Sequence, residues 1–97
     1  MSYAEKIIIF VKNIYRNREK LIKILREAAK TIKKKHPEIV KIILFGSIAR
    51  GYYGIKSDAD ILIILRESEF ERYFDRIPKY LADFNAPIPV DIFPLYN

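Results

Sequence analysis

Two apolar runs joined by a polar loop constrain the fold of this chain more than any other feature. The first run, Ile39–Phe45, stops at Gly46 and Ser47, and the second, Ile61–Leu65, follows closely after two aspartates. Short apolar runs bounded by glycine and polar residues predict buried strands. Only Lys41 interrupts the first run, which indicates a strand that is covered on both faces.

The two aspartates before the second run are Asp58 and Asp60. Residues two apart on a strand point to the same face, with Cα atoms about 6.5 Å apart. Two carboxylates on one face repel each other unless a cation lies between them. Mg2+ takes oxygen ligands and keeps room for substrate phosphates. The pair therefore predicts a site for a divalent metal.

Gly46 and Ser47 predict the complementary half of such a site. Glycine lets the backbone approach a phosphate closely, and the N–H groups at a helix start bind anions. We therefore expect a short helix to begin here, with the Ser47 hydroxyl as a further donor. Arg50 has two interpretations of equal weight. It contacts the phosphates, or it braces the loop by pairing with a carboxylate.

These residues carry a resemblance to a known family. Gly46 and Ser47, ten further residues, and then Asp58-Ala59-Asp60 resemble the G-S-x10-D-x-D signature of the DNA polymerase beta-like nucleotidyltransferase superfamily. The fuller run from Gly46 to Gly51 is similar to the minimal nucleotidyltransferases of that superfamily. The resemblance implies a third carboxylate on a later strand, and Asp91 within Val90–Phe93 fits that position. It covers about residues 39–93.

The resemblance also implies a fold and a reaction. The fold would be α/β (α+β), a small mixed sheet with helices packed against it, formed by residues 1–97 as one domain. Asp58, Asp60 and Asp91 would hold two Mg2+ ions, and Gly46, Ser47 and Arg50 would bind the nucleotide, with ATP as the expected donor. Attack of a hydroxyl on the α-phosphate would transfer AMP and release pyrophosphate. Asp91 would serve the attacking hydroxyl.

The family also implies a partner. Minimal nucleotidyltransferases are often paired with a HEPN-domain protein as antitoxin and toxin, so the acceptor would be a tyrosine hydroxyl of a HEPN protein. A second hypothesis is an antitoxin that neutralises its partner by binding alone. The third is a basic nucleic-acid binder, which the net charge of +6 permits, although no helix-turn-helix or aromatic-rich strand pattern supports it. A homo-oligomer is also compatible with the sequence.

Apolar periodicity predicts the remaining elements. A first helix is expected over residues 3–15, a second one capped by Asn17 and ending near His36-Pro37, and a third over Arg66–Tyr80. Glu67, Glu69 and Glu71 would lie in the first turn of the third helix, and Pro78 would kink or split it, leaving 79–84 as a second part. Val90–Phe93 is expected as a strand near a sheet edge, because Pro89 precedes it.

Two further features limit the chemistry. His36 is the sole histidine, and nothing near it in the sequence suggests the partner that a general base needs. The absence of cysteine excludes disulfides, zinc–thiolate sites and thiol nucleophiles. No apolar run is long enough to span a membrane and the amino terminus lacks a signal-peptide layout, so we expect a cytoplasmic protein.

Overall fold

The computed structural model describes residue 2, residues 13–54 and residues 56–96. Within them the chain forms three strands and three named helices, and residues 13–16 are also helical. Most of the helix expected over residues 3–15 lies outside the described residues. The elements are α2 (Arg18–Lys35), β1 (Ile39–Phe45), α3 (Gly46–Arg50), β2 (Ala59–Leu65), α4 (Tyr73–Leu81) and β3 (Val90–Tyr96).

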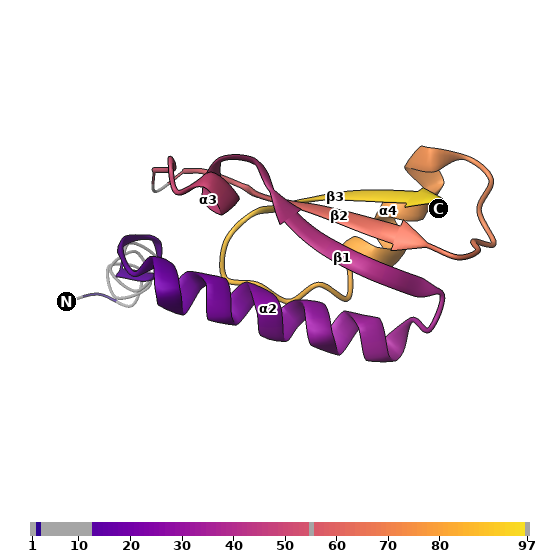
Figure 1. The fold of residues 1–97 in the computed structure, drawn as a ribbon, viewed down its shortest axis with the longest axis horizontal. Coiled ribbons are helices and arrows are strands. Elements are labelled where there is room, and N and C mark those ends of the chain that lie inside the picture. The colour runs from indigo at the N-terminus through magenta and orange to yellow at the C-terminus, as the bar shows by residue number, and fades with distance from the viewer. Residues whose placement is uncertain (1, 3–12, 55, 97) are drawn as a thin grey trace.

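The three strands form one mixed sheet in the order β1-β2-β3 (Figure 1). β1 and β2 are antiparallel, and β2 and β3 are parallel. The parallel pair needs a crossover, and the segment containing α4 provides it. This arrangement confirms the expected α/β fold with a small mixed sheet.

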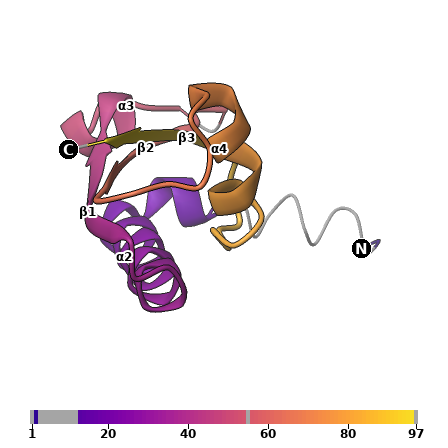
Figure 2. The ribbon, with the colours of Figure 1, turned by 90° about the vertical axis from the view of Figure 1, so that its right-hand side faces the viewer.

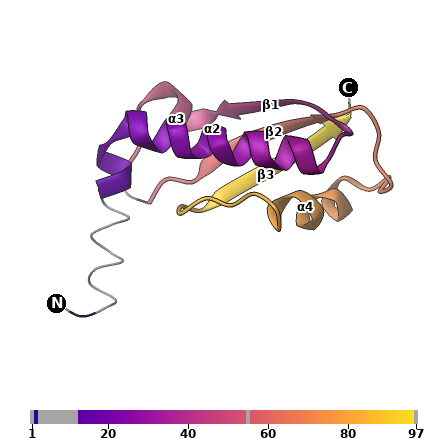
Figure 3. The same ribbon diagram turned by 90° about the horizontal axis from the view of Figure 1, so that it is seen from below.

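The helices α2 and α4 lie against the same face of the sheet (Figures 2 and 3). Along β2, residues alternate strictly between buried and half-buried, as a strand with one covered face requires. The buried side packs against the apolar stripe of α2 and against Tyr80, Phe84 and Ile88. The stripe consists of Leu21, Leu25, Ala28 and Ile32.

The expectation that β1 is covered on both faces is wrong. β1 is an edge strand, and Val40 and Phe45 keep 38% and 39% of their surface exposed. A continuous apolar run does not distinguish a buried strand from one whose outer face is apolar but open. β3 forms the opposite edge, as expected, although it continues three residues beyond the predicted end.

The second helix forms as predicted. The Asn17 side chain accepts a hydrogen bond from the Lys20 backbone N–H at 3.1 Å, so it is the N-cap. Glu19 lies in the first turn and three lysines lie in the last turn, where each charge suits the helix dipole. The helix ends at Lys35, and the chain then passes Pro37 and enters β1.

The third predicted helix is shorter than expected. α4 begins at Tyr73, so Glu67, Glu69 and Glu71 precede it and do not interact with its dipole as predicted. Pro78 lies inside this helix and does not divide it into two. Pro78 is the sixth residue of this helix, so it lies beyond the first turn, and its missing N–H removes one bond to the carbonyl four residues earlier.

Arg76 explains how α4 is held against the sheet. Its side chain is buried and donates to the carbonyls of Phe70, Glu71 and Pro94 at 2.9, 2.7 and 3.3 Å. The guanidinium also stacks over the Tyr96 ring, with 4.2 Å to the centroid. These contacts satisfy a buried charge and cover part of the free edge of β3.

His36 has a partner that the sequence did not reveal. Its Nε2 lies 2.6 Å from Asp83 Oδ2, and its ring meets that of Tyr80 edge-on. His36 precedes the first residue of β1. Asp60 pairs with Phe45 at the other end of that strand, about 20 Å away. The pairing therefore joins α2 to the segment after α4, and its role is structural.

No helix in the described part of the chain combines the length and apolar character needed to cross a membrane.

Candidate active site

The sheet brings the predicted carboxylates together at one of its ends. Asp60 is the second residue of β2, and it pairs with Phe45 of β1 on one side and with Asp91 of β3 on the other. Neighbouring strands lie about 4.8 Å apart, so Asp60 and Asp91 are adjacent. Asp58 lies one residue before β2. The expectation that Asp58 and Asp60 both lie on the strand is therefore wrong for Asp58, which belongs to the preceding loop.

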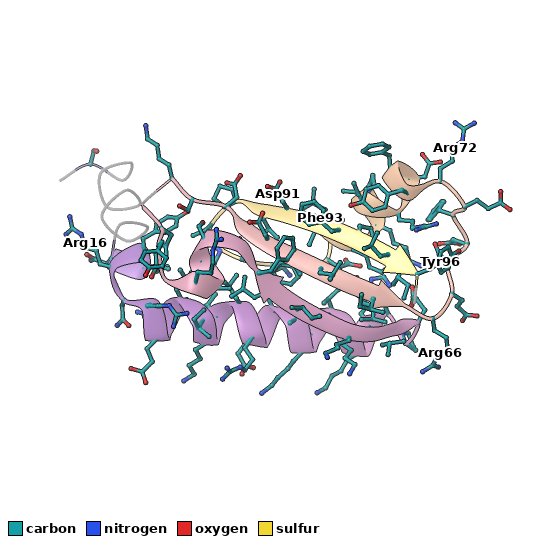
Figure 4. The ribbon with its side chains drawn as sticks, turned by 45° about the horizontal axis from the view of Figure 1, so that its top comes forward. Arg16, Arg66, Arg72, Asp91, Phe93 and Tyr96 are labelled. Atoms are coloured by element: carbon teal, nitrogen blue, oxygen red, sulfur yellow. The ribbon has the colours of Figure 1, made fainter. Side chains whose placement is uncertain are left out.

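The charges of Asp58 and Asp60 act on Asp91. The pKa of Asp91 is raised, first by partial burial, then by the charges of Asp58 and Asp60, and last by a hydrogen bond to Asp58. Asp91 and Asp58 are exposed and Asp60 is half-buried. Figure 4 shows Asp91 and Phe93 on β3, on the side of the sheet opposite α2. The cluster therefore faces solvent with a surplus of negative charge.

Gly46 connects the turn after β1 to this cluster. It has a φ of +77°, which only glycine adopts at little cost. A Cβ at this position would collide with the Asp60 carboxylate. Glycine is thus required here because any side chain would displace the Asp60 carboxylate. This reason differs from the one expected from the sequence, which was the close approach of a phosphate to the backbone.

The donor set suits a hard divalent cation, which prefers carboxylate oxygens. Burial first, and then the charges of Asp58 and Asp60, raise the pKa of Asp91, and a cation beside these carboxylates would offset the repulsion on Asp91. In residues 2, 13–54 and 56–96, however, no three acidic or histidine side chains converge tightly enough to enclose an ion as they stand. Holding an ion between Asp58, Asp60 and Asp91 would require these side chains to rotate.

The other two predicted residues differ in their surroundings. Ser47 is half-buried in α3, its carbonyl accepts from the Tyr52 N–H at 3.0 Å, and within the described residues its hydroxyl has no protein partner. Arg50 is exposed, and no carboxylate of the described residues pairs with it. The bracing interpretation of Arg50 therefore has no support, whereas Ser47 is free to contact a ligand.

Tyr15 contacts the segment that carries Asp58. Its hydroxyl donates to the Ser57 carbonyl at 2.9 Å, and its side chain is only 4% exposed. Burial raises the pKa of Tyr15, and the nearby charge of Asp58 raises it further. Tyr53 packs beside it, with ring centroids 6.4 Å apart.

Arg18 braces the other side of the site. Its Nη2 donates to the Ala49 carbonyl at 2.9 Å, near the end of α3. Gly51, with a φ of +83°, ends that helix beside the Arg18 side chain. Arg18, and not Arg50, therefore joins α2 to the end of α3, through a backbone carbonyl and not through a carboxylate.

Sequence reasoning missed both Tyr15 and Arg18. They lie 42 and 31 residues from the groups that they contact, and neither belongs to a recognisable spacing. Tyr15 fits the apolar spacing of a helix, and Arg18 is one of 18 lysines and arginines in the chain, so neither residue stands out in the sequence.

Comparison with known proteins identifies a family. A family model described as "Nucleotidyltransferase domain" matches residues 25–96, which include all the predicted site residues. Two similar proteins of Methanocaldococcus jannaschii are both named "Putative protein adenylyltransferase". One is 43% identical over 72 residues, covering 74% of this chain and 69% of the relative. The other is 32% identical over 76 residues, covering 77% of each.

A solved structure shows the same fold. It is that of a protein from Sulfolobus solfataricus described as "a putative nucleotidyltransferase". The two structures superimpose with a TM-score of 0.69 and 26% sequence identity, over 89% of this chain and 76% of that one. The mixed sheet and its helices are therefore shared with a protein described as a nucleotidyltransferase.

Proposed function

The chain belongs to the nucleotidyltransferase domain family, and from this premise we propose that it is a Mg2+-dependent protein adenylyltransferase. It would transfer AMP from ATP to a hydroxyl of a partner protein, as one domain formed by residues 1–97. What carries the proposal is the three-carboxylate cluster beside the Gly46–Ser47 turn. A cluster of like charges that faces solvent is unfavourable in the isolated protein, and a bound cation would offset that cost.

The site residues would have different roles in the reaction. Asp58, Asp60 and Asp91 would hold Mg2+, which when bound neutralises charge on the attacking and leaving oxygens of the phosphoryl transfer. The Ser47 hydroxyl and the backbone at Gly46 would orient the β- and γ-phosphates, and exposed Arg50 would add a positive charge near them. Asp91 would also lie beside the attacking hydroxyl and accept its proton. Pyrophosphate then leaves from the α-phosphate.

The open face of the sheet supports a protein as the acceptor. The residues that follow Asp60 and Asp91 on that face are apolar, among them Leu62 and Phe93, and Phe45 packs against Phe93 with 5.3 Å between ring centroids. In the described strands this face carries Lys41 as its one cation. A nucleic acid would need a row of cations to contact its phosphates. An apolar surface next to the acidic cluster suits a protein chain better.

The finer biology follows from the family resemblance. We propose that the acceptor is a tyrosine of a HEPN-type toxin and that the chain acts as its antitoxin in the cytoplasm. A second candidate is an antitoxin that neutralises the toxin by binding alone. The exposed apolar sheet face is compatible with both, because each requires a stable contact with the partner.

Transfer of a labelled nucleotide tests the proposal. The protein is incubated with Mg2+, a HEPN-domain protein and ATP labelled either at the α- or at the γ-phosphate. The α-label should appear on a tyrosine of the HEPN protein and the γ-label should not, because pyrophosphate leaves. Asp60→Asn serves as the inactive control. A tight complex with the HEPN protein in which neither label is transferred would overturn the enzymatic proposal in favour of the binding-only antitoxin.

A further inference from the structure

Asp58 is the last loop residue before β2. β2 begins at Ala59, whose N–H donates to the Pro89 carbonyl at 2.9 Å. The backbone after Asp58 is therefore fixed by pairing within the sheet. The backbone before it belongs to a loop, and its carboxylate is exposed. Strand pairing alone does not determine where Asp58 points.

The Tyr15 hydroxyl supplies the missing constraint. It holds the Ser57 carbonyl at 2.9 Å, and that carbonyl belongs to the peptide group whose nitrogen is that of Asp58. The same turn is closed locally, because the Ser57 N–H donates to the Gly54 carbonyl at 3.1 Å and the Gly54 N–H donates to Ser57 Oγ at 3.0 Å. Asp58 is thus held between a fixed peptide on each side.

The Tyr15 ring is itself well anchored. It is 4% exposed, and its neighbour Ile14 is 1% exposed in the main core. The Asn17 N–H donates to the Asn13 carbonyl at 3.1 Å, which joins this turn to the start of α2. Arg18, one residue into α2, holds the Ala49 carbonyl from the same junction. The junction before α2 therefore contacts both backbone segments that flank the acidic cluster.

We propose that Tyr15 is a positioning residue of the acidic site, whose hydroxyl fixes the Ser57 carbonyl and thereby keeps the Asp58 carboxylate beside Asp91. Tyr15 touches neither substrate nor metal in this role. The inference rests on the proposed function only in what Asp58 binds. The contact itself is a property of the protein without ligand.

The first test uses the protein without ligand. Tyr15→Phe keeps the ring and removes only the hydroxyl, and Tyr52→Phe is the matched control, because the Tyr52 side chain is 84% exposed. Amide hydrogen exchange of Ser57 should become faster in Tyr15→Phe and stay unchanged in Tyr52→Phe. Exchange at Ile63 in the central strand reports global stability and should change little. Unchanged exchange at Ser57 in Tyr15→Phe would overturn the proposal.

The second test measures what the positioning achieves. Calorimetry follows the binding of a non-hydrolysable ATP analogue at increasing Mn2+ concentrations. Tyr15→Phe should need about two- to ten-fold more Mn2+ for half-maximal binding, the change expected for loss of one hydrogen bond, and saturating Mn2+ should restore wild-type affinity. Loss of affinity that saturating Mn2+ does not restore would contradict positioning and indicate simple destabilisation. Absence of nucleotide binding in the wild type would instead contradict the proposed function, while the exchange result would still decide the role of Tyr15.

Discussion

At the scale of single residues, the site depends on charges that oppose each other in the free protein. Asp91 shows this most clearly, because its pKa is raised by partial burial and by the charges of Asp58 and Asp60. A carboxylate whose pKa is raised on folding costs stability when it is ionised, at neutral pH. This cost decreases as the pH falls through the raised pKa and is gone below the ordinary pKa of the group. The residues that the reaction would use are therefore ones that folding alone would not favour.

Asp91→Asn tests this opposition between stability and function. The amide keeps the shape and removes the charge, so transfer of AMP should be abolished while nucleotide affinity changes little, because Asp91 would act mainly on the attacking hydroxyl. Thermal unfolding without metal at neutral pH should show a small gain in stability, below about 1 kcal/mol, since solvent screens an exposed group. Unchanged transfer in Asp91→Asn would remove this residue from the catalytic set.

Gly46→Ala tests the contact between the turn and Asp60. The positive φ makes any side chain unfavourable by about 1 kcal/mol or more, and the new Cβ would displace the Asp60 carboxylate. Metal-dependent nucleotide affinity should fall at least about ten-fold, as loss of a charged ligand implies. Gly51→Ala is the matched control, because Gly51 also has a positive φ but its nearest obstacle is Arg18 Nε at 3.7 Å. Equal loss of affinity in the two variants would mean that backbone strain, and not Asp60, is responsible.

At the scale of elements, a polar network ties the start of β1 to α4 and α2, at the end of the sheet far from the acidic cluster. Glu38 accepts hydrogen bonds from Lys79 and Tyr80 at 2.9 and 2.8 Å. Asp83 is held by Lys35 at 2.8 Å and by His36 at 2.6 Å. Glu38 thus joins the start of β1 to α4, and Asp83 joins the end of α2 to the segment after α4.

This network predicts sensitivity to acid. Burial alone would raise the pKa of Glu38, but hydrogen bonds led by that from Lys79 lower it overall, and those from Lys35 and then His36 lower the pKa of Asp83. A lowered pKa contributes stability that is present above the ordinary carboxylate pKa of about 4 and is lost as the pH falls below it. Chemical unfolding between pH 7 and 3 should therefore show a smaller loss of stability in Asp83→Asn than in the wild type. Glu27→Gln, which removes an exposed pair, should match the wild type, and an Asp83→Asn profile parallel to the wild type would contradict the assignment.

The elements also show what the sequence could and could not predict. β1 and α2 were predicted within a residue of their bounds, because an apolar run before glycine and a capped helical stripe are local signals. The exposed outer face of β1 was not predictable, since it depends on the order of strands in the sheet. α4 starts seven residues later than expected because buried Arg76 binds the carbonyls of Phe70 and Glu71, a tertiary contact that periodicity does not encode.

At the scale of the whole molecule, the acidic cluster is assembled from segments far apart in the chain. The spacing of Gly46, Ser47, Asp58 and Asp60 predicted the candidate site from the sequence, and the parallel pairing of β2 with β3 places Asp91 next to Asp60. Tyr15 and Arg18 escaped prediction because their roles exist only after the chain has folded. One face of the sheet packs against the core and the helices α2 and α4 (Figures 2 and 3), and the opposite face carries the acidic residues at one end and apolar residues along the rest.

The most direct test of this account is whether nucleotide binding requires both metal and the acidic cluster. Calorimetry with a non-hydrolysable ATP analogue is performed with and without Mg2+ on the wild type and on Asp58→Ala. We expect binding by the wild type only when Mg2+ is present, and strongly weakened binding of both metal and nucleotide by Asp58→Ala. Nucleotide affinity that is undiminished in Asp58→Ala without metal would contradict the assignment of this cluster as the metal and nucleotide site.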